Sequence, residues 1–158
     1  MASGCHLTRR LCLIYFSEVT QFDNLSFPQG MKMPFHILIF DDDPEICKVK
    51  KAQLTLDGAF TVMATIDPVK GLKLAKSKQP DLIWLDIIMP DTGGFEVLQK
   101  LKGDVDTASI PVIMPTGVDE VESRERAVEL YNEDYVVKTA DRPTLIAAIN
   151  QALTRRPK

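Results

Sequence analysis

A carboxylate ends the apolar run Asp81-Leu82-Ile83-Trp84-Leu85-Asp86, and a segment rich in turn-forming residues follows it, Ile87-Ile88-Met89-Pro90-Asp91-Thr92-Gly93-Gly94. An uninterrupted apolar run of this length is typical of a strand that is covered on both faces. Asp86 therefore stands at the exit of a predicted buried strand, where a Pro- and Gly-containing loop presents its carboxylate. We single out Asp86 as the first candidate reactive group of the chain.

Three further apolar runs also end in polar residues. The run at 35–40 leads into Asp41-Asp42-Asp43, the run at 110–115 leads into Thr116, and the run at 135–137 leads into Lys138. In a parallel sheet the carboxyl ends of the strands share one edge, where open α/β sheets bind their ligands. We therefore expect five polar residues to surround one crevice: Asp41, Asp42, Asp86, Thr116 and Lys138.

Helical patterns alternate with the apolar runs along the chain. Strands are predicted at 35–40, 60–66, 81–86, 110–114 and 134–137, and helices at 44–56, 68–78, 95–103, 120–131 and 142–153. Asp43 and Pro44 are typical of a helix start, with Asp43 as the N-cap. An apolar stripe of Ile46, Val49, Ala52 and Leu56 is expected to face the core. This alternation predicts the α/β class, a doubly wound parallel sheet with helices on both faces.

The composition is that of an ordinary globular protein. The chain has 158 residues, 45% hydrophobic and 26% charged, which favours one domain with a full core. The net charge of -3 gives no indication of a nucleic-acid surface. Three cysteines without a paired C-x-x-C spacing argue against a disulfide framework and a zinc site, and favour the cytoplasm. No apolar stretch reaches the roughly 20 residues that a membrane span needs.

The first 33 residues show no clear helical or strand period. The patch at 11–16 follows Arg9-Arg10, but it is too short for a signal-peptide core. We expect residues 1–33 to be an N-terminal extension, either flexible or the product of a start codon placed too early. Residues 34–155 form the predicted domain, and residues 156–158 form a C-terminal tail.

The predicted crevice suits phosphoryl chemistry. Carboxylates that converge on one point repel each other, and a bound cation relieves that repulsion. An all-oxygen site favours Mg²⁺ or Mn²⁺. The hydroxyl of Thr116 and the ammonium of Lys138 are suited to phosphoryl oxygens, and the Asp86 carboxylate to nucleophilic attack that forms an acyl phosphate.

Four segments in this order resemble the receiver domain of bacterial two-component response regulators. They are Ile37-Leu38-Ile39-Phe40-Asp41-Asp42-Asp43, Leu85-Asp86-Ile87-Ile88-Met89-Pro90 with Gly94, Pro111-Val112-Ile113-Met114-Pro115-Thr116-Gly117, and Tyr135-Val136-Val137-Lys138. The resemblance covers about three quarters of the chain and implies a flavodoxin-like (βα)5 fold with strand order 2-1-3-4-5. It also implies phosphoryl transfer from a sensor histidine kinase or a histidine phosphotransfer protein.

The resemblance assigns a role to each motif residue. Asp86 is the implied phosphoacceptor and, with Asp42, a direct ligand of Mg²⁺. Asp41 is implied to hold a metal-bound water, and the backbone carbonyl of Ile88 is a further implied ligand. Thr116 and Lys138 are implied to contact phosphoryl oxygens, and Thr116 and Tyr135 to move together as the switch pair.

Three positions depart from the family pattern. Thr139 stands where a proline usually follows the lysine, Pro115 precedes Thr116, and Tyr131 replaces a usual glycine. In this family, side chains at the positions of Ile88 and Val118 help to set the rate of acyl-phosphate hydrolysis. Both are apolar here, so we expect at most slow self-dephosphorylation rather than enzymatic turnover.

These observations predict a stand-alone, chemotaxis-regulator-like receiver. It would signal to a downstream target protein, with no nucleic-acid or membrane partner, through the predicted helix at 120–131 and the elements after it. The phosphodonor is expected to dock beside the helix at 46–56. Two alternatives stay open. One is a receiver-like binding module that acts without phosphorylation, and the other is a metal-dependent phosphatase that uses Asp41 and Asp43 as a D-x-D pair.

Overall fold

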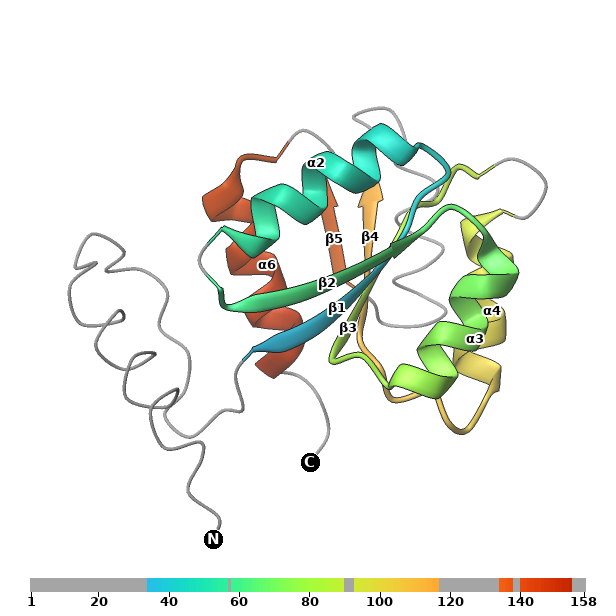
Figure 1. Cartoon of the computed structure of the whole chain (residues 1–158). Helices are drawn as coiled ribbons and strands as arrows, with labels where there is room; N and C mark the ends of the chain where they lie inside the picture. Colours follow the sequence, from blue (N-terminus) through green and yellow to red (C-terminus); the bar gives the residue numbers. More distant parts are fainter. Residues whose placement is uncertain (1–33, 57, 90–92, 117–133, 138–139, 155–158) are drawn as a thin grey trace, which may run out of the picture.

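The computed structural model describes residues 34–56, 58–89, 93–116, 134–137 and 140–154, which form a parallel sheet flanked by helices (Figure 1). The strands are β1 (Phe35–Phe40), β2 (Phe60–Thr65), β3 (Leu82–Leu85), β4 (Val112–Thr116) and β5 (Asp134–Val137). The described helices are α2 (Pro44–Thr55), α3 (Pro68–Lys78), α4 (Gly94–Gly103) and α6 (Arg142–Thr154). The predicted helix at 120–131, the extension at 1–33 and the tail at 156–158 lie outside the described residues.

All neighbouring strands pair in parallel, in the order β2-β1-β3-β4-β5. This confirms the predicted doubly wound, flavodoxin-like arrangement. The chain first adds β2 on one side of β1 and then crosses over to add β3 on the other side. The order therefore reverses between β1 and β3, and ligands of open α/β sheets bind beside such a reversal.

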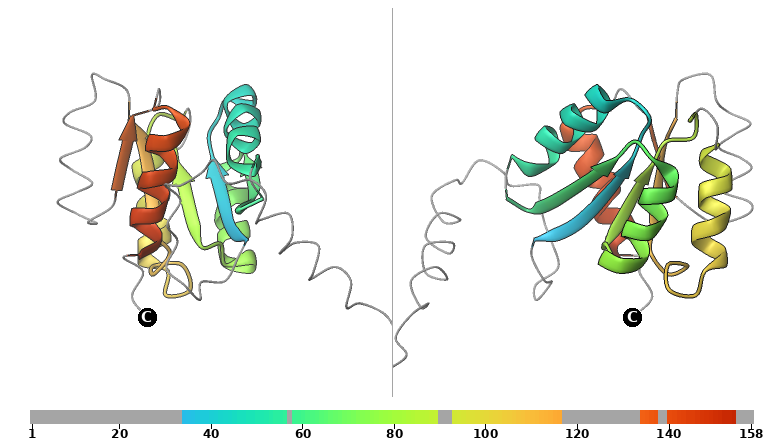
Figure 2. Two further views of the ribbon diagram at one scale, coloured as in Figure 1. Left: turned by 90° about the vertical axis from the view of Figure 1, so that its left-hand side faces the viewer. Right: turned by 45° about the vertical axis from the view of Figure 1, so that its right-hand side comes forward.

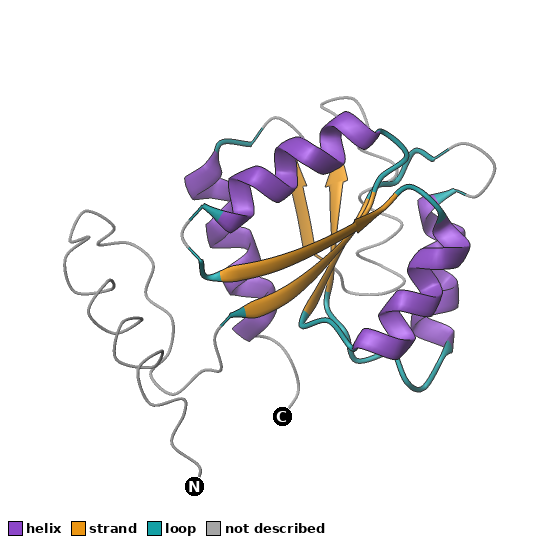
Figure 3. Ribbon diagram, in the orientation of Figure 1, coloured by secondary structure: helices purple, strands orange, loops and turns teal. Residues whose placement is uncertain are grey.

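Helices cover both faces of the sheet, as Figures 2 and 3 show. On one face, α2 and α6 pack over Ile37 and Ile39 of β1 and over Trp84 of β3. On the other face, α3 and α4 pack over a second set that includes Leu38 and Phe40. Successive residues of one strand thus enter different cores, which explains the unbroken apolar sequences of β1 and β3.

The predicted starts of α2 and α3 are confirmed. The Asp43 side chain accepts hydrogen bonds from the backbone N–H groups of Glu45 (2.8 Å) and Ile46 (3.4 Å), and Pro44 begins α2. Asp67 caps α3 in the same way. Each cap satisfies backbone donors at the amino end of a helix that follows a strand directly.

The predicted core face of α2 is wrong. Val49 is 54% exposed and Leu56, just after the helix, is 72% exposed, whereas the buried residues of α2 are Cys47, Lys50 and Leu54. The helix is rotated so that this second stripe, which also has i, i+3 and i+7 spacing, faces the sheet. Because lysine is charged, a hydrophobicity pattern does not reveal this stripe. The long aliphatic stem of Lys50 nevertheless packs like an apolar side chain.

The bounds of three strands also differ from the prediction: β3 spans Leu82–Leu85 rather than 81–86, β4 ends at Thr116 rather than at 114, and two further bounds have a visible cause. β2 ends at Thr65, and Ile66 is 56% exposed. β4 begins at Val112 rather than at Ile110, because Ile110 is fully buried in a turn in which its N–H donates to the Thr107 carbonyl. Pro111 then has no N–H with which to enter the ladder. No described helix has the length and apolarity needed to cross a membrane.

Candidate functional site

Two carboxylates lie at the reversal point of the sheet. Phe40 of β1 pairs with Leu85 of β3 in the parallel register, and the next residue in each strand is an aspartate, Asp41 and Asp86. The Asp86 N–H donates to the Phe40 carbonyl at 2.9 Å, so the ladder continues to the site itself. The register therefore brings Asp41 and Asp86 side by side from positions 45 residues apart in the chain.

Asp42 completes an acidic cluster with Asp41 and Asp86. One carboxylate oxygen of each residue lies within 4.8 Å of the other two. Asp41 and Asp86 are buried, with 1% and 2% of their surfaces exposed, whereas Asp42 is exposed. Three converging negative charges, two of them withdrawn from water, favour a cation between them. Carboxylate oxygens at this spacing fit a small hard cation such as Mg²⁺.

Backbone donors orient both buried carboxylates. Asp41 Oδ1 accepts from the N–H of Asp43 at 3.0 Å, and Asp86 Oδ1 accepts from the N–H of Ile88 at 3.3 Å. Each bond turns the chain back within two residues and holds the carboxylate in a fixed orientation. The site is therefore built largely by its own loops.

Gly94 holds the loop after Asp86 against α4. Its N–H donates to the Ile87 carbonyl at 2.9 Å. A Cβ at this position would lie 2.0 Å from the Asp86 carbonyl oxygen and 2.7 Å from the Ile87 Cα. Only a residue without a side chain permits this approach, so Gly94 contributes directly to the placement of Asp86.

The remaining predicted site residues are only partly placed. Thr116 is the last residue of β4 and pairs with Val137 of β5, and Tyr135 pairs with Met114. The side chains of Thr116 and Tyr135, and the whole of Lys138, lie outside what the structure describes. The Ile88 carbonyl as a metal ligand stays a prediction.

A pocket that sequence reasoning missed adjoins the acidic cluster. Asp41 lines it together with Lys50 of α2 and Trp84 of β3, and the Lys50 Nζ lies 5.5 Å from the centre of the Trp84 ring. Burial lowers the pKa of Lys50 from its ordinary value, and the nearby Asp41 partly opposes this shift. The sequence signal was a single lysine in phase with Cys47 and Leu54, a pattern that usually indicates a solvated side chain.

Cys47 lies beneath the same cluster. Its Sγ is 3.5 Å from the backbone oxygen of Asp41, to which the thiol donates. Burial, with the carboxylates of Asp41, Asp43 and Asp42 adding to it, raises the pKa of the Cys47 thiol from 9.0 to about 11. The negative charges of the acidic cluster therefore act on the Cys47 thiol that packs below them.

A family model of the response regulator receiver domain matches residues 37–150. The chain belongs to this family. The family membership confirms the resemblance that the four motifs predicted. Receiver domains bind Mg²⁺ in an acidic active site, and Asp41, Asp42 and Asp86 form an acidic cluster among the described residues of this chain.

Two curated relatives show how receivers occur in longer and shorter proteins. The DNA-binding dual master transcriptional regulator RpaA of Synechocystis is 38% identical over 120 residues, 76% of this chain and 49% of RpaA. PilH of Pseudomonas aeruginosa is 33% identical over 117 residues, 74% of this chain and 96% of PilH. The chain thus spans about half the length of relatives such as RpaA, but nearly all of PilH.

A solved structure supports the fold. The receiver domain of the sensor histidine kinase PA1611 from Pseudomonas aeruginosa, with a magnesium ion coordinated in its active-site cleft, superposes with a TM-score of 0.68. It is 22% identical, and the match covers 76% of this chain and 98% of that one. At this identity the likeness establishes the common fold and no more.

Proposed function

We propose that this chain is a Mg²⁺-dependent phosphoacceptor that takes a phosphoryl group on Asp86 from a histidine of a sensor kinase or phosphotransfer protein. The observation that carries the proposal is the burial of Asp86 within 4.8 Å of Asp41 and Asp42 at the sheet reversal. An Asp86 oxygen attacks phosphorus, the phosphorus–nitrogen bond of the phosphohistidine breaks, and the imidazole leaves with the electron pair. The product is an acyl phosphate.

Each residue of the site has a distinct part in this step. Asp42 and Asp86 would hold the metal ion directly, Asp41 would hold it through a water molecule, and the Ile88 carbonyl would be a further ligand. The ion neutralises charge on the phosphoryl oxygens when it is bound. The Ile88 N–H donates to one Asp86 oxygen and so orients the carboxylate for its attack on phosphorus. Thr116 and Lys138 would donate to the remaining phosphoryl oxygens, and we assign the switch to Thr116 and Tyr135.

The output in this proposal is a phosphorylation-dependent contact with a downstream protein in the cytoplasm. The receiver itself performs at most slow self-dephosphorylation, because the exposed Ile88 side chain cannot hold a water molecule by hydrogen bonds. A stable acyl phosphate shifts the receiver between two conformations only by the difference in its interactions with them.

Acetyl phosphate with Mg²⁺ tests the proposal by intact mass spectrometry. We expect one added phosphoryl group on the wild type and none on Asp86→Asn. Asp81→Asn is the matched control: it changes a carboxylate at the opposite end of β3, where Asp81 accepts from the His36 N–H at 2.8 Å. If the wild type gains no phosphoryl group from acetyl phosphate or from a phosphorylated phosphotransfer protein, the alternative of a phosphorylation-independent binding module is favoured. Phosphate-ester turnover that depends on Asp41 rather than Asp86 would favour the phosphatase.

A further inference from the structure

A buried glycine stands inside α3, where it weakens the helix. Gly71 is the fourth residue of α3, and its N–H donates to the Asp67 carbonyl at 2.9 Å, so it takes part in the regular helix. Glycine destabilises a helix interior relative to alanine, because its backbone loses more conformational freedom on folding. A glycine at this position therefore indicates a constraint from outside the helix.

The constraint is the ring of Phe40 at the end of β1. A Cβ on Gly71 would lie 2.2 Å from Cε1, 2.6 Å from Cζ and 2.7 Å from Cδ1 of this ring. Phe40 is only 1% exposed and belongs to the core that α3 and α4 cover, so the ring has little room to turn away. Phe40 thus packs directly on the backbone of α3, and only a residue without a side chain permits that contact.

Two members of the acidic cluster are attached to the backbone of Phe40. Asp41 is the next residue of the chain, and the Phe40 carbonyl accepts the Asp86 N–H at 2.9 Å. Phe40 is also paired with Thr65 of β2 and with Leu85 of β3. A shift of the Phe40 backbone would therefore move Asp41 with it and strain the bond that aligns Asp86.

The start of α3 is tied to the same place. The Thr65 hydroxyl donates to the carbonyl of Asp67, the N-cap of α3, and accepts from the Asp67 N–H, each at 3.2 Å. The Thr65 carbonyl in turn accepts the Asp41 N–H at 3.3 Å. A helix pushed away from Phe40 would pull on this connection. Movement of the ring and movement of the helix would thus both disturb Asp41.

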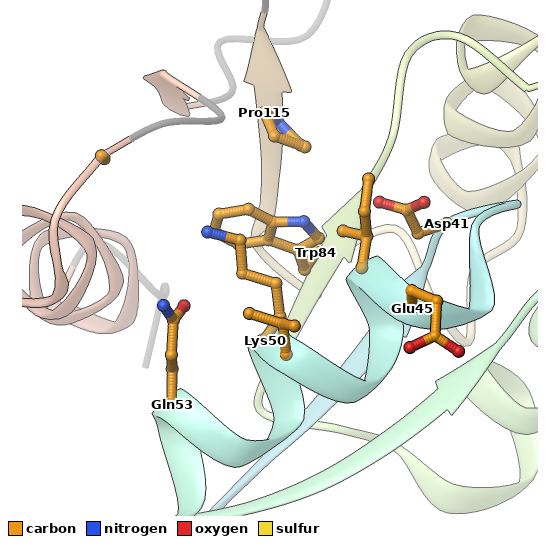
Figure 4. Close-up of a pocket in the computed structure, with 9 residues that line it drawn as sticks. Asp41, Glu45, Lys50, Gln53, Trp84 and Pro115 are labelled. Carbon is orange, nitrogen blue, oxygen red and sulfur yellow. The ribbon is translucent and has the colours of Figure 1, made fainter.

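The sheet is packed less closely on its opposite face. There Asp41 borders a pocket of about 390 Å³, together with Trp84 and residues of α2 (Figure 4). Side chains do not fill that space, whereas the core around Phe40 is closed by α3 and α4. Close packing therefore holds the end of β1 from the α3 side.

We propose that Gly71 is a positioning residue of the metal site, and that its contact with Phe40 fixes the end of β1 so that the acidic cluster can converge on one cation. This inference rests on the proposed Mg²⁺-dependent function. Mg²⁺ requires near-ideal octahedral geometry, with ligands at about 2.0–2.1 Å. Small displacements of the groups behind the ligands are therefore enough to weaken binding, and such groups typically affect metal affinity roughly 10–100-fold.

Gly71→Ala tests this role in the intact chain. A melt followed by circular dichroism first gives the temperature range in which each variant is folded, and Mg²⁺ is titrated within that range. Trp84 is the only tryptophan of the chain and borders the same pocket as Asp41, so its fluorescence reports binding. We expect the Mg²⁺ affinity of Gly71→Ala to fall about ten-fold.

Ala75→Val is the matched control for a loss of stability. Ala75 is fully buried in the same core, one helical turn further from the start of α3, and its carbonyl accepts the N–H of the C-cap Gln79. The larger side chain should lower Tm by overpacking, as Gly71→Ala does. The Mg²⁺ affinity of Ala75→Val should stay close to that of the wild type, because Ala75 lies toward the far end of the helix.

Phe40→Val provides the rescue. Valine has none of the ring atoms that the added Cβ would meet, and a β-branched residue suits a strand. Alone, it leaves a gap beside Gly71 and should weaken Mg²⁺ binding about three-fold. The methyl group of Gly71→Ala fills part of that gap, so the double variant should bind Mg²⁺ more tightly than either single variant. If Gly71→Ala does not fold, the comparison of Phe40→Val with the double variant decides.

Three results would overturn the positioning role. They are a folded Gly71→Ala that binds Mg²⁺ as the wild type does, Ala75→Val that weakens binding as much as Gly71→Ala, and a double variant that binds Mg²⁺ no better than Phe40→Val. A wild type that binds no Mg²⁺ would instead overturn the proposed function, and the positioning role with it. The two failures are therefore distinguishable.

Discussion

Gly94→Ala should destabilise the protein by distorting the loop that carries Asp86. The added Cβ would lie 2.0 Å from the Asp86 carbonyl oxygen, 2.7 Å from the Ile87 Cα and 2.9 Å from the Asp86 carbonyl carbon. All three are backbone atoms, so no side chain can rotate away and relieve the clash. The start of α4 or the loop must move by more than an ångström, which also stretches the 2.9 Å bond from the Gly94 N–H to the Ile87 carbonyl.

The expected cost is at the upper end for an overpacked site, about 3 kcal/mol in the free energy of unfolding. For a chain of this size that corresponds to a fall in Tm of roughly 10 °C. Urea unfolding followed by Trp84 fluorescence measures the free energy, and circular dichroism measures Tm. Because the same shift moves Asp86, Mg²⁺ affinity should fall with stability.

Gly93→Ala is the control next to it. Its Cβ would meet nothing within 4 Å, and the backbone φ of -59° suits alanine. We expect a change within about 0.5 kcal/mol, because the lower preference for Ala at an N-cap is offset by the smaller backbone entropy that Ala loses on folding. If Gly94→Ala loses less than about 1 kcal/mol relative to Gly93→Ala, close packing of α4 is not what places the Asp86 loop.

Three further predictions concern the site itself. Ile88→Asn should speed the decay of phosphoryl-Asp86 roughly ten-fold, by offering a water molecule one hydrogen bond, as measured by the loss of the phosphorylated mass after the donor is removed. Asp42→Asn should weaken Mg²⁺ binding about ten-fold or more in a Trp84 fluorescence titration, because one charge of the cluster is lost. Asp106→Asn is the control and should leave Mg²⁺ binding unchanged, because Asp106 is far from the cluster and pairs with Lys76. With the other two cysteines replaced by serine, Cys47 should react with iodoacetamide at pH 8 about 100-fold more slowly than a free thiol, because only the thiolate reacts and its pKa is raised from 9.0 to about 11.

Each of these predictions has an outcome that contradicts it. Equal decay of the wild type and Ile88→Asn would show that this side chain does not limit hydrolysis. Unchanged Mg²⁺ affinity in Asp42→Asn would remove that residue from the metal site. The alkylation rate of Cys47 should keep rising with pH until about 11, since the thiol is still protonated below its raised pKa. A plateau near pH 9 would mean that the acidic cluster and burial do not act on the thiol.

Most of the fold could be predicted from the sequence, because the relevant signals are local. The bounds of α3 and β5 were predicted to the residue, and Asp43 was identified as the cap of α2. The Asp and Pro pairs that start helices, and the apolar runs of buried strands, act within a few residues of themselves. The grouping of Asp41, Asp42 and Asp86 also followed, since a parallel sheet gathers the carboxyl ends of its strands.

Other features depended on contacts between distant segments. The rotation of α2 was mispredicted because Val49 and Leu56 fit an amphipathic stripe as well as Cys47 and Leu54 do, and only packing against β1 and β3 chooses between them. The same packing buries Lys50 against Trp84, 34 positions away, and opens the pocket beside Asp41.

The sequence by itself therefore determined the order of the elements, the parallel sheet and the acidic cluster with Asp86 at its centre. The tertiary structure alone decided which face of α2 is buried, why Gly94 tolerates no side chain, and that a pocket adjoins the cluster. The physical reason is the separation along the chain between the residues that interact. Caps and strand patterns depend on near neighbours in the chain, whereas burial, clashes and unpaired polar atoms depend on what the other elements place against them.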